Sequence, residues 1–291
     1  MSAPVVIDSQ PIEVVGHGGL RLVGESRGDP AAPPVLLLHG GGQTRHAWDE
    51  TAQVLAREGR RTIAVDLRGH GDSAWAADGD YTLDAFAEDI RIVARSLPTP
   101  PVIIGASLGG LTSMVAEAES PTRISSALVL VDIAPRMEPE GVAKIVGFMR
   151  ASPDGFASLE EAADAIASYL PDRPRPTDLS GLAKNLRTGA DGRLRWHWDP
   201  AFLGGRAPHR TSEVSRLTDA ARALRIPTLL VRGRRSDLLS EQGVEEFLHL
   251  VPGARFVDVK DAGHMVAGDR NDAFTAAILP FLSEVSRPSV V

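Results

Sequence analysis

Short apolar segments alternate with amphipathic segments along most of this sequence. Apolar runs of this length are typical of strands that are buried on both faces of a sheet. They predict strands at residues 35–38, 62–66, 102–104, 128–131, 228–231 and 255–259. Apolar residues at helical spacing predict helices at residues 47–58, 83–96, 241–250 and 272–282, and a glycine-rich turn predicts a hairpin of residues 5–15 and 20–26. This order indicates an α/β domain with a mostly parallel sheet.

The pattern changes in the middle of the chain. Residues 135–215 contain many prolines and no buried-strand run, and helical segments are indicated at residues 140–149 and 159–169. The expected organisation is therefore a helical cap inserted into a single α/β core, with a first core part at residues 1–134, the cap at 135–215 and a second core part at 216–291. Ligands bind at the carboxyl ends of parallel strands, so such a cap would lie over the site.

Composition narrows the classes of function. The chain has 291 residues, no cysteine and a formal net charge of −7. A disulfide and a thiolate nucleophile are thus excluded, and the negative charge argues against nucleic acid or an anionic membrane as a partner. The first residues do not follow the signal-peptide pattern, and no apolar run has the length of a membrane span, so we expect a cytoplasmic protein. The sequence leaves open whether it forms a homo-oligomer.

Candidate chemistry begins at Ser107. It lies within Gly-Ala-Ser-Leu-Gly, residues 105–109, between an expected strand and a small-residue helix. This is the G-x-S-x-G nucleophile elbow in the context that the motif requires. The pentapeptide alone is a weak signal, because a glycine-rich turn can match it by chance. In an elbow, the glycines would leave room for a sharp turn that holds the serine hydroxyl above the sheet.

A serine nucleophile needs a base, and the base needs an orienting group. His264 and Asp237 each follow an expected strand, and the chain order Ser, Asp, His is the order found in hydrolases with this elbow. Asp237 would also suit the N-cap of the helix at 241–250. Asp132, directly after the strand at 128–131, is the alternative acid.

These residues together resemble the α/β-hydrolase superfamily. The resemblance rests on His39-Gly40, the segment DLRGHGDS at residues 66–73, the Ser107 elbow, Asp237 and Gly263-His264. It implies an eight-stranded, mostly parallel sheet with one antiparallel early strand, and a cap after the sixth strand. By resemblance, Ser107 is the nucleophile, His264 the base and then the acid, and Asp237 the residue that orients His264. Some members take that acid from the sixth strand, where Asp132 lies.

The resemblance also assigns supporting roles. The oxyanion hole would use the backbone N–H of Leu108 and, from the loop after the third strand, that of Gly41. His39 and His70 are expected to hold their own loops rather than to react. We expect no cofactor, since neither a metal-ligand spacing nor a phosphate-binding loop is present in the sequence.

The nucleophile type indicates the reaction. Epoxide hydrolases and haloalkane dehalogenases of this superfamily carry aspartate at the elbow, whereas a serine forms an acyl-enzyme from a carbonyl compound. We therefore expect a serine hydrolase of small to medium carboxylic esters. The alternatives are a carbon–carbon bond hydrolase, a lactonase or a cofactor-free perhydrolase of the same fold, and a non-catalytic ligand receptor. Candidate substrate contacts, which could equally form the cap's own core, are Trp48, Phe148, Met149, Trp196 and Trp198.

Overall fold

The computed structural model describes residues 6–171, 175, 177–204 and 213–285. Its main sheet has eight strands in the order β1-β2-β4-β3-β5-β6-β9-β10. Strand β2 is antiparallel to both of its neighbours, and all other neighbouring strands are parallel. The strands are β1 (Ser9–Val15), β2 (Arg21–Arg27), β3 (Pro34–Leu38), β4 (Arg61–Val65), β5 (Val102–Ala106), β6 (Ala127–Val131), β9 (Thr228–Gly233) and β10 (Arg255–Val259). The expected sheet is confirmed, although residue 5 of the predicted hairpin lies outside the described residues.

Helices cover both faces of the sheet, which explains why its central strands are wholly apolar. In β3, Val35 and Leu37 pack in the cluster with α1 and α10, whereas Leu36 and Leu38 pack with the helices of the opposite face. The central strands therefore bury alternate side chains in two separate cores. One face carries α1 (Asp49–Arg57) and α10 (Asn271–Val285), and the other α2 (Leu83–Arg95), α3 (Leu108–Ala118), α7 (Val214–Ala223) and α8 (Glu241–Leu250).

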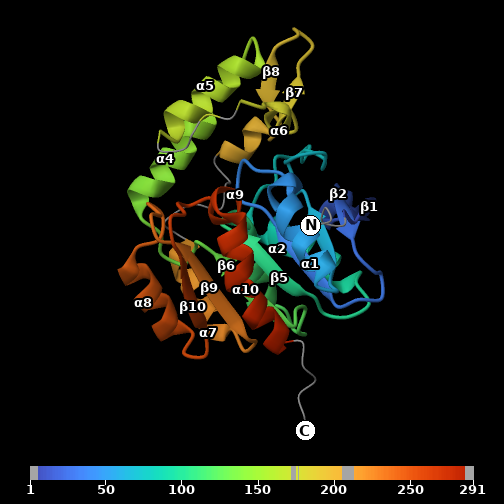
Figure 1. Ribbon diagram of the computed structural model, residues 1–291, viewed down its shortest axis with the longest axis vertical. Helices are drawn as coiled ribbons and strands as arrows, with labels where there is room; N and C mark the ends of the chain where they lie inside the picture. Colours follow the sequence, from blue (N-terminus) through green and yellow to red (C-terminus); the bar gives the residue numbers. More distant parts are fainter. Residues whose placement is uncertain (1–5, 172–174, 176, 205–212, 286–291) are drawn as a thin grey trace, which may run out of the picture.

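The elements between β6 and α7 lie beyond one end of the sheet (Figure 1). They are α4 (Pro139–Arg150), α5 (Leu159–Tyr169), α6 (Ser180–Ala183), β7 (Leu186–Thr188), β8 (Leu194–Trp196) and the short 3-10 helix η3 (Pro200–Leu203). We refer to them as the cap. The remaining short helices are η1 (His17–Gly19), η2 (Arg45–Trp48) and α9 (Val266–Asp269). The domain boundaries at residues 135 and 215 stay a prediction, and residues 205–212 lie outside the described part.

The cap contains a two-stranded hairpin that the sequence pattern did not predict. Strands β7 and β8 pair antiparallel, with Leu186 opposite Trp196. The turn between them includes Gly192, which has φ 78°, a conformation that glycine adopts without strain. Each strand is only three residues long, too short for an alternating pattern to stand out.

None of the helices in the described ranges combines the length and the apolar character needed to cross a membrane.

Candidate active site

Ser107 lies at a sharp turn between β5 and α3. Its backbone has φ 46° and ψ −114°, a conformation that residues with a side chain rarely adopt. A Cβ added at Gly105 would lie 2.6 Å from backbone atoms of Gly109, and one added at Gly109 would lie 2.5 Å from the carbonyl oxygen of Leu38. The turn therefore depends on glycine at both positions, and it has the form of a nucleophile elbow.

His264 is hydrogen-bonded to a buried aspartate. It follows β10 and precedes α9, and its Nδ1 lies 2.7 Å from Oδ2 of Asp132. Asp132 follows β6 and is fully buried, whereas the imidazole is 17 % exposed. A carboxylate only accepts hydrogen bonds, so Nδ1 carries the proton and Nε2 remains as a free acceptor of a proton. This is the orientation that a general base requires.

Two groups, one at the end of β9 and one in the loop that follows it, hold the Asp132 carboxylate. Oδ1 accepts a hydrogen bond of 3.0 Å from the N–H of Gly233, and Oδ2 lies 2.5 Å from Oγ of Ser236. That Oγ also accepts hydrogen bonds from the N–H groups of Leu238 and Leu239. The Ser236 hydroxyl must therefore donate to Asp132. Ser236 was not predicted; the available signal was a hydroxyl residue shortly after a strand whose carboxyl end reaches the site.

The structure corrects the expected partner of His264. Asp237 does not occupy that position: its Oδ2 lies 2.8 Å from Nζ of Lys144 on α4, and both side chains are about half exposed. Strands β6 and β9 are parallel neighbours, so the residues after either strand can reach the same edge of the sheet. In the loop after β9, the hydroxyl of Ser236 forms a hydrogen bond with Asp132 in the site, whereas the carboxylate of Asp237 forms an ion pair with Lys144 of the cap. Asp132, the alternative acid, is the one next to His264.

The loop after β3 lies beside Ser107 and leaves selected N–H groups available. The N–H of Gly40 donates to Oε1 of Gln43, and the N–H of Gly109 donates to the carbonyl of His39. Within the described ranges, no hydrogen bond engages the N–H of Gly41 or that of Leu108. These are the two groups expected to form an oxyanion hole.

His39 and His70 belong to a buried histidine cluster with His197 of the cap. The ring centroids of His39 and His70 are 5.3 Å apart, and those of His70 and His197 are 5.8 Å apart. Burial lowers the pKa of His39 to about 4 and that of His70 to about 3, and it also lowers the pKa of His197 well below the usual value. All three rings are therefore neutral near pH 7. His39 Nε2 accepts a hydrogen bond from the Leu67 N–H, and its Nδ1 contacts the Gly40 carbonyl, so this residue holds its loops in place.

His197 connects the cap to two loops of the core. Its Nδ1 accepts a hydrogen bond of 2.7 Å from the N–H of Gly71. The proton is therefore on Nε2, which lies 3.3 Å from the carbonyl oxygen of Gly42 and donates to it. Gly42 follows the expected oxyanion donor Gly41, so the cap contacts the loop that would stabilise an oxyanion.

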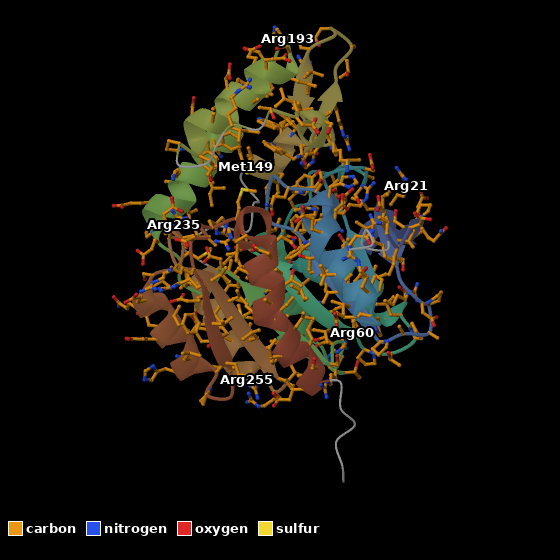
Figure 2. All side chains as sticks on the ribbon, in the orientation of Figure 1. Arg21, Arg60, Met149, Arg193, Arg235 and Arg255 are labelled. Atoms are coloured by element: carbon orange, nitrogen blue, oxygen red, sulfur yellow. The ribbon has the colours of Figure 1, made fainter. Side chains whose placement is uncertain are left out.

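A cavity of about 590 Å³ lies between the cap and the core, and Ser107 and His264 both line it. All five expected substrate contacts also line it, namely Trp48, Phe148, Met149, Trp196 and Trp198. Figure 2 shows Met149 between the cap helices and the core. Other members of the wall were not predicted from the sequence, among them Ile145, Ile166 and Tyr169. The sequence feature that could have indicated them is the apolar face of the two helices α4 and α5. This face lines the cavity and does not form a separate core.

The cap side of the cavity wall contains a cluster of aromatic rings. The rings of Trp196 and Trp198 are stacked at 5.1 Å, and those of Phe148 and Tyr169 are stacked at 4.3 Å. Phe148 and Trp196 join these two pairs at 5.5 Å. Trp48 has another role as well, since it is 1 % exposed and packs against Phe274 in the core.

In the part of the chain that the structure describes, no group of three or more His, Cys, Asp or Glu side chains is arranged to hold a metal ion.

Comparison with known proteins agrees with this geometry. A family model described as "alpha/beta hydrolase fold" matches residues 33–270. The esterase Rv0045c of Mycobacterium tuberculosis is 33 % identical over 248 residues, which cover 82 % of this chain and 79 % of the relative. A 3-hydroxybutyrate-oligomer hydrolase of Cupriavidus necator is 30 % identical over 274 residues, covering 87 % and 90 % of the two chains.

Solved structures give the same result. That of the M. tuberculosis esterase Rv0045c matches with a TM-score of 0.77 and 28 % identity, covering 96 % of this chain and 93 % of the other. E-2-(acetamidomethylene)succinate hydrolase matches with a TM-score of 0.81 and 26 % identity, covering 95 % and 99 %. The similarity therefore extends over the core and the cap together.

Proposed function

This chain belongs to the alpha/beta hydrolase fold family, and we propose that it hydrolyses carboxylic esters of small to medium size through an acyl-enzyme on Ser107. The observation that carries the proposal is the hydrogen bond of 2.7 Å between His264 and the buried Asp132, beside a cavity that Ser107 also lines. Esterase relatives that match most of the chain support it.

Acylation begins at the serine hydroxyl. Oγ of Ser107 attacks the ester carbonyl carbon while its proton passes to Nε2 of His264. Asp132 stabilises the imidazolium that results, because its carboxylate accepts the hydrogen bond from Nδ1. The N–H groups of Leu108 and Gly41 stabilise the tetrahedral oxyanion, and losing one such donor typically costs about 3–4 kcal/mol of transition-state stabilisation. The intermediate collapses as the alcohol leaves with the proton from Nε2.

Deacylation uses the same groups, with a water molecule in the place of the serine hydroxyl as the attacking group. His264 takes a proton from a water molecule, whose oxygen attacks the acyl carbon of the Ser107 ester. The second tetrahedral intermediate expels Oγ, which regains the proton, and the carboxylic acid is released.

The charged residues that line the cavity argue against the alternative of a carbon–carbon bond hydrolase. An ionised diketone would need a cation in the cavity wall. Lys184 is the cation among the described lining residues, and its Nζ lies 3.4 Å from Oδ2 of Asp49, which neutralises it. A neutral ester has no such requirement.

Hydrolysis of p-nitrophenyl acetate and butyrate by wild type and Ser107→Ala tests the proposal. We expect turnover by wild type and a loss of at least 10³-fold in the variant, by analogy with other serine triads. A phosphonate inhibitor should add its mass to wild type and not to Ser107→Ala. A folded wild-type protein that neither turns over these esters nor reacts with the phosphonate would instead support a ligand receptor.

A substrate panel separates ester hydrolysis from lactone hydrolysis and from perhydrolysis, since all three use an acyl-enzyme. Lactones, and acetate with hydrogen peroxide, should react more slowly than acyclic esters. A higher kcat/KM for either would replace the esterase proposal with that activity.

A further inference from the structure

The cavity differs in chemical character at its two ends. Figure 1 shows helices α4 and α5 on one side of the cap and α6 with the β7–β8 hairpin on the other. The residues of α4 and α5 that line the cavity are apolar or aromatic, and so is Leu170 directly after α5. The apolar arm is the name used here for the part of the cavity that is lined by Val142, Ile145, Val146, Ile166, Tyr169 and Leu170.

Polar side chains line the opposite end. This part, called here the polar mouth, comprises Thr44, His46, Asp49, Glu50, Lys184 and Asn185. Two interactions join the cap to the core here: the Lys184–Asp49 ion pair at 3.4 Å and the hydrogen bond from Thr44 Oγ1 to Asn185 Oδ1 at 3.1 Å. Glu50 is exposed and Lys184 is half exposed, so this end opens to solvent.

The polar mouth has one carboxylate without a cationic partner. Asp49 is paired with Lys184 at 3.4 Å and with Arg27, which does not line the cavity, at 3.6 Å, whereas Glu50 has no ion-pair partner among the described residues. No arginine is found among the described residues that line the cavity. An anionic group at this end would therefore meet the unpaired carboxylate of Glu50, and both nearby cations, Lys184 and Arg27, are already paired with Asp49.

The position of His264 decides which part of an ester occupies each end. His264 must deliver its proton to the leaving alcohol, so the alcohol lies on the imidazole side. The chain directly after His264 forms α9, and α9 packs against η2, which contributes His46 to the polar mouth. The alcohol therefore faces the polar mouth, and the acyl chain extends toward α4 and α5.

From these observations we infer the substrate class: an ester of an uncharged, apolar acyl chain longer than acetyl with a polar, non-anionic alcohol. The acyl chain occupies the apolar arm and the alcohol occupies the polar mouth. This inference rests on the proposed esterase function, because it uses Ser107 and His264 in the roles given above.

Chain length and end charge test the apolar arm. The substrates are p-nitrophenyl acetate, p-nitrophenyl hexanoate and the mono-p-nitrophenyl ester of adipic acid, whose acyl chain has the length of hexanoate but ends in a carboxylate. We expect kcat/KM to rise on the order of 100-fold from acetate to hexanoate, because each buried methylene contributes roughly fourfold. The adipate ester should lose most of this gain, since its carboxylate would enter an apolar wall.

A larger side chain in the apolar arm tests whether the acyl chain of the substrate binds there. Ile145→Phe narrows the apolar arm and should lower the ratio of hexanoate to acetate turnover at least tenfold. Ala143→Phe is the matched control, because Ala143 is exposed on the same helix and does not line the cavity. It should leave the ratio at its wild-type value. If Ile145→Phe does not fold, Ile166→Phe on α5 makes the same test.

Two hexanoate esters of similar size test the polar mouth. 2-Hydroxyethyl hexanoate has a neutral polar alcohol, and carboxymethyl hexanoate has an anionic one. We expect the neutral ester to be hydrolysed severalfold faster, and Glu50→Lys to reduce or reverse this preference. Equal rates for the two esters in wild type would overturn the assignment of the mouth.

The outcomes separate this inference from the proposed function. Wild type that hydrolyses p-nitrophenyl acetate but shows no gain with hexanoate overturns the apolar arm and leaves the esterase intact. Absence of turnover on every ester, with folded protein, overturns the proposed function itself.

Discussion

The carboxylate of Asp132 lies 2.7 Å from Nδ1 of His264, although the two residues are 132 positions apart in the chain. The fold brings them together because β6 and β10 both border β9, and each residue follows the carboxyl end of its strand. The hydrogen bond leaves Nε2 of His264 available to accept a proton, and Ser107 lines the same cavity as His264.

The first prediction separates the two acids. Asp132→Asn should lower kcat about 10⁴-fold, because the amide no longer stabilises the imidazolium and favours the wrong tautomer. Asp237→Asn should lower kcat less than about threefold, since it removes a surface ion pair with Lys144 that is worth at most about 1 kcal/mol. Steady-state kinetics on one ester, with circular dichroism to verify folding, compares them. A larger loss in Asp237→Asn would contradict the assignment of Asp132.

The second prediction concerns Ser236, whose hydroxyl donates to the Asp132 carboxylate at 2.5 Å. Ser236→Ala should lower kcat on the order of tenfold, because a hydrogen bond to a charged group contributes about 1.5–3 kcal/mol. Ser236→Thr, which keeps the hydroxyl, should restore most of the activity.

Ser240→Ala is the control for Ser236→Ala. Ser240 caps α8 through a hydrogen bond to the N–H of Gly243 and does not contact the site. Its loss should lower the free energy of unfolding by about 1 kcal/mol and leave kcat unchanged. If both alanine variants lose stability but neither loses kcat, Ser236 is a structural residue only.

The third prediction concerns the elbow. Gly105→Ala places a Cβ 2.6 Å from backbone atoms of Gly109, so the turn must open and move Ser107. We expect the free energy of unfolding to fall by about 1–3 kcal/mol and activity to be lost. Gly147→Ala in α4 is the matched control, because its Cβ meets no atom within 4 Å. That variant should unfold at the same or a slightly higher temperature, as measured by scanning calorimetry.

The fourth prediction concerns stability against pH. In the folded protein the pKa of His39 is lowered to about 4 and that of His70 to about 3 by burial, whereas the pKa of an unfolded histidine has its ordinary value of 6.5. Below pH 6.5 the unfolded chain binds protons that the folded chain does not, so the free energy of unfolding decreases as the pH falls toward 4. His39 alone would account for roughly 3 kcal/mol over that range.

Urea unfolding at pH 7, 6, 5 and 4 measures how the free energy of unfolding changes with pH. The change should be smaller in His70→Asn, because one of the groups that bind protons only in the unfolded chain is removed. A free energy of unfolding that stays constant between pH 7 and 5 would show that the histidine cluster takes up protons while folded.

Much of the fold was accessible from the sequence because its determinants are local. A strand such as residues 102–106 is wholly apolar since both of its faces are covered, and Gly105 and Gly109 mark the elbow through steric need alone. The choice between Asp132 and Asp237 was not local. Neighbouring parallel strands are only about 5 Å apart, so both acids reach the same edge. Which of them faces His264 depends on how the loop after β9 folds, and Lys144 from the cap takes part in that.

The cap was harder to predict for a related reason. Its apolar residues serve two purposes, since Trp196 packs against Phe156 and also lines the cavity. A sequence pattern registers that such a residue is buried, but it does not distinguish burial in a core from exposure to a ligand site.

The two hydrogen bonds of His197 have a consequence for catalysis. One imidazole spans the N–H of Gly71 and the carbonyl of Gly42, so the cap cannot lift at this point without releasing the backbone beside Gly41. Any opening of the cap at His197 would therefore remove a restraint on the loop that carries Gly41. Oxyanion stabilisation would then depend on the cap being closed.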